Sequence, residues 1–178
     1  MKIGLTQRVL LHRGQAYDSL EHSWYKYLQG HTLIPIPNRL CVPFPEIDLL
    51  IVTGGDDHPI RNQIELELVN SMLSHDLPVI GVCHGCQLLT QRLHGSVVPA
   101  ADHQDSYHEV RYRDESHLVN SYHKLRIERS PPGATVLARD PDGYPEAWIQ
   151  GRTAGIMWHP ERMTQPWIPE EIQLLLTR

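Results

Sequence analysis

Short apolar runs alternate with helical patterns through the first part of the chain. The apolar runs predict buried strands at residues 2–6, 32–36, 48–53 and 78–82. Apolar residues at helical spacing predict helices at residues 18–29, 59–75 and 84–94. Asp18 is suited to cap the first helix, Pro59 to begin the second, and Gly95 to end the third. Strands that alternate with helices in this way indicate a parallel sheet with helices on both faces.

The remainder of the chain has a different pattern, in which short strands are separated by turns. These strands are predicted at residues 109–113, 125–128, 135–138, 146–150 and 154–157. A turn at residues 140–143 and a closing helix at residues 169–177 complete the pattern. We therefore expect one α/β domain over residues 1–178, a three-layer sandwich with a mostly parallel central sheet and a small antiparallel region.

Composition narrows the class of protein. The 178 residues, 40% of them hydrophobic and 21% charged, are typical of a globular domain. A net charge of −5 gives no support for a nucleic-acid partner, and no apolar run is long enough for a membrane span. Gln7 and Arg8 interrupt the apolar start of the chain, so we expect no signal peptide. Three cysteines cannot all pair, and free thiols favour a reducing cytoplasmic location.

A cysteine follows the apolar run at residues 78–82, in the sequence GVCHGCQ (residues 81–87). A nucleophile on a sharp strand-to-helix turn needs small neighbours two positions away, and Gly81 and Gly85 meet that need. The turn places Cys83 at a helix N-terminus, which favours the thiolate, and lets the His84 N–H stabilise an oxyanion. By itself, this pattern also fits a small buried cysteine at the end of a strand.

A histidine follows the last apolar strand, in the sequence WHPE (residues 158–161). A residue at the carboxyl end of that strand would share the sheet edge with Cys83. Glu161 can accept a hydrogen bond from one ring N–H of His159 and so direct the other ring nitrogen toward the thiol. By itself, the sequence also fits a surface turn. The two motifs together predict a catalytic set of Cys83, His159 and Glu161.

These motifs, in this order and together with IVTGG (residues 51–55), resemble the class I glutamine amidotransferase superfamily. VNSYH (residues 119–123) is similar to the corresponding segment of its γ-glutamyl hydrolase-type members, which include γ-glutamyl-GABA hydrolase. The resemblance implies a flavodoxin-like fold, hydrolysis of a γ-glutamyl amide through a glutamyl thioester, and no cofactor. It also implies roles for individual residues: oxyanion N–H groups from Gly55 and His84, and substrate contacts from Gln87, Ser121 and Tyr122.

The beginning of the chain, KIGLTQR (residues 2–8), resembles small hydrolases of bacterial capsule phosphoramidate pathways. Those enzymes act on γ-glutamyl-CDP-amidate, so the resemblance implies a nucleotide-linked small-molecule substrate and a role in capsule biosynthesis. Arg8 lies just past the first strand, where it could contact a diphosphate or could be a solvated loop charge.

Other polar residues have two interpretations each. The histidines and aspartates between residues 102 and 123 could suggest a metal, but their spacing matches no helical pair, and we expect no metal site. Asp56 and Asp57 are expected to cap the helix at residue 59 rather than to bind substrate. Cys41 is expected to have no role in the chemistry, and three tryptophans, Trp24, Trp148 and Trp158, are expected in the core.

Two other functions fit the same scaffold. The chain could be a glutaminase subunit that delivers ammonia to a separate synthase, or a non-enzymatic binding or stress-response protein. Hydrolysis of a γ-glutamyl amide by the isolated chain would argue against the first. Covalent trapping at Cys83 would argue against the second. The sequence leaves a homodimer open.

Overall fold

The computed structural model describes residues 1–39, 45–100 and 105–177 of the chain. Its strands are β1 (Lys2–Thr6), β2 (Arg8–His12), β3 (Gln15–Ser19), β4 (Thr32–Ile36), β5 (Leu49–Val52), β6 (Val79–Val82), β7 (Ser96–Pro99), β8 (Ser106–Tyr112), β9 (Glu115–Ser121), β10 (Leu125–Arg129), β11 (Thr135–Arg139), β12 (Pro145–Gln150) and β13 (Thr153–Ile156). Its helices are α1 (Ser23–Tyr27), α2 (Pro59–Ser74), α3 (His84–Arg92) and α4 (Glu170–Gln173), with 3-10 turns at Pro160–Arg162 and Leu174–Leu176.

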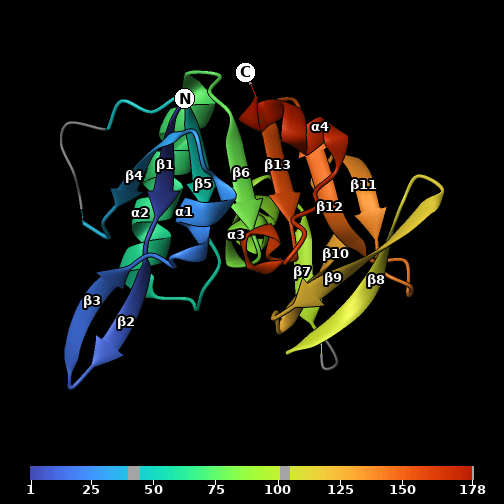
Figure 1. Cartoon of the computed structure of the whole chain (residues 1–178), viewed down its shortest axis with the longest axis horizontal. Helices are drawn as coiled ribbons and strands as arrows, with labels where there is room; N and C mark the ends of the chain where they lie inside the picture. The colour runs from blue at the N-terminus through green and yellow to red at the C-terminus, as the bar shows by residue number, and fades with distance from the viewer. Residues whose placement is uncertain (40–44, 101–104, 178) are drawn as a thin grey trace.

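Nine strands form one sheet in the order β4-β1-β5-β6-β13-β12-β11-β8-β9. The strands from β4 to β13 pair in parallel, and those from β13 to β9 pair antiparallel. The predicted parallel sheet is therefore half of a larger mixed sheet, and two small sheets, β7–β10 and β2–β3, stand beside it (Figure 1).

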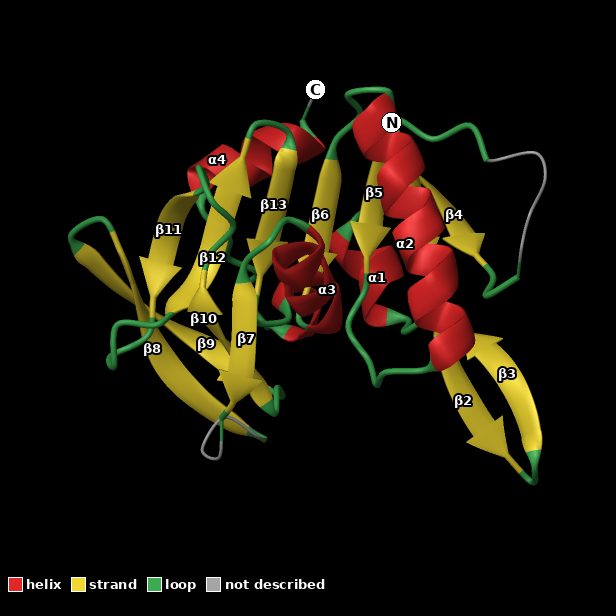
Figure 2. Cartoon of the chain, turned by 180° about the vertical axis from the view of Figure 1, so that it is seen from behind, coloured by secondary structure: helices red, strands yellow, loops and turns green. Residues whose placement is uncertain are grey.

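Helices cover both faces of the parallel half, which confirms the predicted three layers. Helices α2 and α3 lie in front of the sheet in Figure 2, while α1 and α4 lie behind it. Alternate residues of β5 face the two sides: Leu49 and Ile51 join the α1 and α4 core, whereas Leu50 and Val52 pack with α2 and α3. Each core strand is therefore apolar throughout, as expected for a sheet that is covered twice.

The N-terminal helix is shorter than predicted. Instead of a helix at residues 18–29, the chain forms the β2–β3 hairpin and then the five-residue α1, and the hairpin projects from the body (Figure 1). The turn of the hairpin is Arg13-Gly14, and both residues have positive φ, as a tight hairpin turn requires. Asp18 is not a helix cap. Its carboxylate accepts hydrogen bonds from the backbone and side chain of Asn38.

The cap predicted for α2 is also wrong. The N-cap position is His58, which makes no side-chain cap hydrogen bond, whereas Pro59 does begin the helix. Asp57 instead accepts a hydrogen bond from the Asn62 side chain at 3.2 Å. The prediction also missed β7 and β9, because neither has a continuous apolar run. Trp24, Trp148 and Trp158 are all buried, as expected. None of the helices in the described ranges is long and apolar enough to cross a membrane.

Candidate active site

Cys83 lies at a strained turn between β6 and α3. Its φ of 53° and ψ of −106° are unusual for a residue with a side chain, and its thiol is nearly buried. The two neighbouring glycines have no room for a side chain. A Cβ on Gly85 would lie 2.0 Å from the Val52 carbonyl oxygen, and one on Gly81 would lie 2.5 Å from the Gly85 backbone. The predicted need for small residues on both sides of the turn is confirmed.

His159 follows the carboxyl end of β13, which is the parallel neighbour of β6. The Cys83 N–H donates to the Ile156 carbonyl oxygen of β13 at 2.8 Å, the Cys83 side chain contributes to raising the pKa of His159, and Nδ1 of His159 lies 2.6 Å from Oε1 of Glu161. Both His159 and Glu161 are buried. The structure therefore brings together the three residues that the sequence predicted as a catalytic set.

The ionisation of His159 is set by its two partners. Burial lowers its pKa, but the hydrogen bonds and negative charges of Cys83 and Glu161 outweigh burial and raise the pKa from 6.5 to about 9. The raised pKa favours the imidazolium form of His159 beside the Cys83 side chain. Complete burial and then the charge of Glu146 raise the pKa of the Cys86 thiol well above the ordinary value.

Asn120 fixes the backbone of His159 and was missed by the sequence analysis. Its side-chain amide donates to the His159 carbonyl oxygen at 2.8 Å, and its side-chain oxygen accepts from the His159 N–H at 2.8 Å. Asn120 lies on β9, at the far edge of the large sheet. The signal for Asn120 in the sequence was a polar residue within the VNSYH segment, in a part of it that is buried.

The loop after β5 contains the predicted oxyanion residue Gly55, which has a φ of +136°. The preceding Gly54 packs directly on the His159 imidazole, because a Cβ there would lie 2.2 Å from Cε1 of His159. Glycine therefore suits Gly54 because of the close approach of His159 and suits Gly55 because of its positive φ.

A buried charge network, Arg61–Glu65–His84, supports this loop and the turn at Cys83. Arg61 is completely buried and donates to the carbonyl oxygens of Thr53 at 2.6 Å and Gly54 at 3.2 Å. It also pairs with Oε1 of Glu65 at 2.9 Å, and the other oxygen of Glu65 lies 2.9 Å from Nε2 of His84. One fully buried carboxylate therefore connects the Gly55 loop to the residue after Cys83.

A cavity of about 280 Å³ opens beside Cys83. It is lined by Gly55, Asp56, Asp57, Cys83, His84, Gln87, Tyr122, His123, Lys124 and Leu125. Two of the three predicted glutamyl contacts, Gln87 and Tyr122, are among these residues, and the third, Ser121, is buried next to them on β9. The Tyr122 ring lies 5.5 Å from the His159 ring.

Arg8 lies at the same edge of the sheet, at the start of β2. Its Cβ is 3.2 Å from the position that a Cβ of Gly55 would occupy, and its guanidinium forms an ion pair with Glu21. Arg8 is therefore not a freely solvated loop charge, because its side chain is only about one-quarter exposed and is paired with Glu21.

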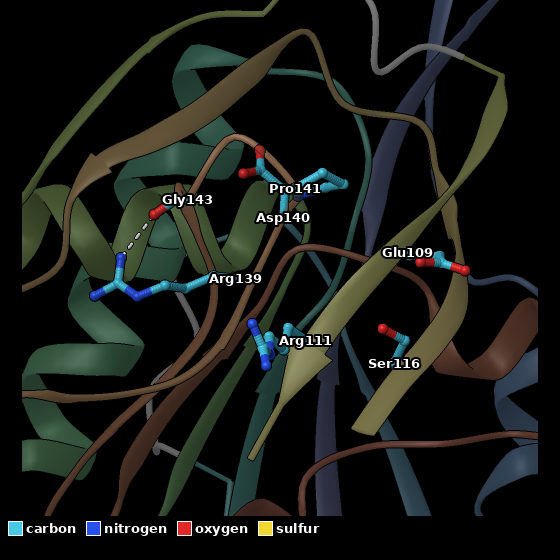
Figure 3. A pocket seen from close by; sticks show the side chains of 7 residues that line it. All are labelled: Glu109, Arg111, Ser116, Arg139, Asp140, Pro141 and Gly143. Atoms are coloured by element: carbon cyan, nitrogen blue, oxygen red, sulfur yellow. Dashed lines mark hydrogen bonds between the residues drawn. The ribbon is translucent and has the colours of Figure 1, made fainter. Parts of the chain in front are cut away.

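A second cavity, of about 340 Å³, lies on the antiparallel half and is shown in Figure 3. It is lined by Glu109, Arg111, Ser116, Arg139, Asp140, Pro141 and Gly143. Arg139 there donates to the Gly143 carbonyl oxygen at 2.7 Å, the dashed line in Figure 3. The cavity contains none of the predicted site residues, and its lining combines charges of both signs.

The remaining residues that the sequence singled out are Cys41 and the histidines and aspartates between residues 102 and 123. Within the described residues, no group of three or more histidine, cysteine or acidic side chains is arranged to hold a metal ion. His108 and His123 flank the buried Glu146, at 3.5 and 3.7 Å. Burial raises the pKa of Glu146 above its usual value. Cys41, Asp102 and His103 lie outside the described residues.

Comparison with known proteins agrees with this geometry. The family model described as "Glutamine amidotransferase class-I" matches residues 15–176. The γ-glutamyl-CDP-amidate hydrolase of Campylobacter jejuni is 25% identical over 182 residues, which cover 91% of this chain and 90% of that protein. A glutamine-hydrolysing GMP synthase of Corynebacterium ammoniagenes is 28% identical over 139 residues, which cover 72% of this chain and 26% of the synthase.

The fold is shared with a solved glutamine amidotransferase of Thermotoga maritima. The TM-score is 0.72 at 16% identity, and the match covers 90% of this chain and 76% of that one. This likeness agrees with the flavodoxin-like α/β arrangement implied by the sequence motifs.

Proposed function

Because the chain belongs to the class-I glutamine amidotransferase family, we propose that it cleaves a γ-glutamyl amide bond with Cys83 as the nucleophile. Family membership and the hydrolase relative make the chain an amide hydrolase of the glutamine amidotransferase type. The observation that carries the proposed mechanism is the contact of Cys83 with His159, which is in turn bonded to Glu161.

In the proposed reaction, the Cys83 thiolate attacks the γ-carbonyl carbon and forms a tetrahedral intermediate. The backbone N–H groups of Gly55 and His84 stabilise its oxyanion. The His159 imidazolium then donates its proton to the departing nitrogen, the C–N bond breaks, and a glutamyl thioester remains on Cys83.

A water molecule completes the cycle. The neutral imidazole of His159 removes a proton from water, which attacks the thioester carbonyl, and the C–S bond breaks to release glutamate. The thiolate and imidazolium are restored. Glu161 keeps the ring in the tautomer and orientation that both steps need. No step calls for a cofactor.

The glutamyl half of the substrate is assigned to the cavity beside Cys83. Gln87 and the Ser121–Tyr122 segment would bind its α-amino and α-carboxylate groups, so that the γ-carbonyl lies over the thiol. Arg8, on the other side of Gly55, would contact the leaving group. By analogy with the Campylobacter jejuni relative, the proposed substrate is γ-glutamyl-CDP-amidate, with a cytoplasmic role in capsule or polysaccharide modification.

The proposal is tested by trapping the nucleophile and measuring turnover. The wild-type chain should be labelled once, at Cys83, by a glutamine-mimicking electrophile such as 6-diazo-5-oxo-norleucine, as read by mass spectrometry. Cys83→Ala should abolish labelling and turnover but keep the circular dichroism spectrum. An alanine variant with substantial activity would exclude the mechanism.

A second function, delivery of ammonia to a synthase, is favoured by the similarity to part of GMP synthase. It predicts slow glutamine hydrolysis by the isolated chain and a large stimulation by a partner enzyme. Rapid hydrolysis of γ-glutamyl-CDP-amidate by the isolated chain would decide against it. A purely binding protein would show no covalent trapping.

A further inference from the structure

Two arginines share one carboxylate beside the catalytic histidine. Glu21, in the loop between β3 and α1, accepts two hydrogen bonds from Arg162, at 2.9 Å from Nε and 2.7 Å from Nη2. It also pairs with the guanidinium of Arg8. The three side chains are between about one-fifth and one-third exposed. In this Arg8–Glu21–Arg162 cluster, two guanidinium cations therefore share the single carboxylate of Glu21, and solvent can reach all three side chains.

The two arginines of the cluster lie next to different parts of the candidate site. Arg8 packs next to Gly55 of the proposed oxyanion site. The guanidinium of Arg162 lies 4.7 Å above the ring of Tyr122, which is in edge contact with His159. The Nε of Arg162 is also 3.8 Å from Oε1 of Glu161. Burial lowers the pKa of Arg162, but the hydrogen bond and charge of Glu21, followed by Glu161 and Cys83, raise it above its ordinary value.

The glutamyl half and the leaving group must occupy different sides of Cys83. The lining of the cavity beside the thiol includes Gln87, His123 and Lys124 but neither Arg8 nor Arg162. The departing nitrogen must lie within reach of His159, because that residue supplies its proton. The group attached to this nitrogen therefore extends toward the side of the site where Arg8, Glu21 and Arg162 lie.

On the basis of the proposed function, we propose that the Arg8–Glu21–Arg162 cluster is the leaving-group site and selects leaving groups with an anionic phosphoryl group on the departing nitrogen. Arginine matches phosphate oxygens through several fixed N–H groups. Glu21 accepts from Nε and Nη2 of Arg162, and in the proposal Nη1 donates to a substrate oxygen.

Glu21 has a positioning role in this arrangement. A flexible arginine loses side-chain entropy when it binds, and the shared carboxylate removes part of that cost by fixing both guanidinium groups in advance. A phosphoryl leaving group that carries two negative charges can compete with the single carboxylate of Glu21 for the two guanidinium groups. A neutral leaving group gains nothing from the cluster.

The test compares two substrates across matched variants. The kcat/KM values for γ-glutamyl-CDP-amidate and for L-glutamine are measured with wild type, Arg8→Gln, Arg162→Gln and Glu21→Gln. The preference for the phosphoryl substrate should fall about 10- to 100-fold in each arginine variant, the usual cost of a lost charge-assisted hydrogen bond. It should fall less in Glu21→Gln, which keeps both cations. Arg113→Gln, which breaks a surface arginine–diglutamate contact, is the control and should keep the wild-type preference.

Inorganic pyrophosphate gives a second measurement. It should inhibit γ-glutamyl-CDP-amidate hydrolysis by wild type competitively, and Arg162→Lys should weaken the inhibition because lysine cannot form the same paired bonds. Circular dichroism and trapping of Cys83 show whether each variant is folded. An unchanged preference in the folded arginine variants, or a wild type that hydrolyses glutamine but not the CDP-amidate, would overturn the leaving-group site alone. A wild type that hydrolyses neither substrate would instead contradict the proposed function.

Discussion

The Arg61–Glu65–His84 network allows a quantitative prediction that does not depend on the substrate. The perturbation is Arg61→Met, which keeps an unbranched side chain but shortens it and removes its charge. The variant leaves the carboxylate of Glu65 buried without its cation, and it leaves the carbonyl oxygens of Thr53 and Gly54 without a donor. Both Arg61 and Glu65 are 0% exposed, so water cannot replace the lost partner.

The expected cost follows from this burial. Removing one partner of a buried ion pair costs about 3–5 kcal/mol, mostly because the remaining charge is uncompensated. Small proteins have unfolding free energies of about 5–15 kcal/mol in total, so the variant should lose a large part of its stability. Adding Glu65→Leu removes the orphan charge. The double variant should therefore be at least about 2 kcal/mol more stable than the sum of the two single changes predicts.

The assay is urea denaturation followed by tryptophan fluorescence, since Trp148 and Trp158 are fully buried and report global unfolding. Arg129→Met, an exposed arginine that lies 4.0 Å from Glu128, is the control and should leave the midpoint unchanged. Additivity of the two single changes within about 0.5 kcal/mol would refute the reasoning, as would a wild-type midpoint in Arg61→Met. The folded fraction of Arg61→Met should also have a lower kcat, because the Gly55 loop loses its support.

Three further predictions concern the turn and its histidine. The free energy of unfolding should contain a His159 contribution that is complete below pH 6.5 and is lost as the pH rises toward about 9, because folding raises the pKa of His159. The difference between wild type and His159→Gln should thus decline by at most ~1.4 kcal/mol per pH unit in that interval, and a constant difference would contradict it. Gly85→Ala should fail to accumulate as folded protein, since its Cβ would lie 2.0 Å from the Val52 carbonyl oxygen, and a native circular dichroism spectrum would show that the turn can relax. Iodoacetamide should modify Cys83 but not the fully buried Cys86 in the native chain, and equal labelling measured by mass spectrometry would show that burial does not protect Cys86.

The sequence was most informative where one physical requirement decided the residue type. Apolar runs gave the parallel strands, and the glycines around Cys83 indicated the turn because no other residue type fits there. The contact of Cys83 with His159 could be inferred since both residues follow parallel strands and must share one edge of the sheet.

The sequence was less informative where tertiary burial decides the role of a charge. Arg61 and Glu65 are four residues apart on α2, a spacing that equally describes an exposed helix pair, and only the fold shows that they are buried. Asn120 could not be assigned because β9 has no continuous apolar run and its partner is distant in sequence. The β2–β3 hairpin was missed because the strand residues are mostly exposed, so the Arg13-Gly14 turn was the available signal.

The position of β13 between β6 and β12 has a consequence for synthesis of the chain. Strand β6 and Cys83 leave the ribosome long before β13 does, so the open edge of β6 has no permanent partner for most of translation. An unpaired apolar edge of this kind can recruit strands from other chains. Insertion of Thr153–Ile156 closes that edge and brings His159 to it in the same event, so a nascent or truncated polypeptide can carry Cys83 without His159.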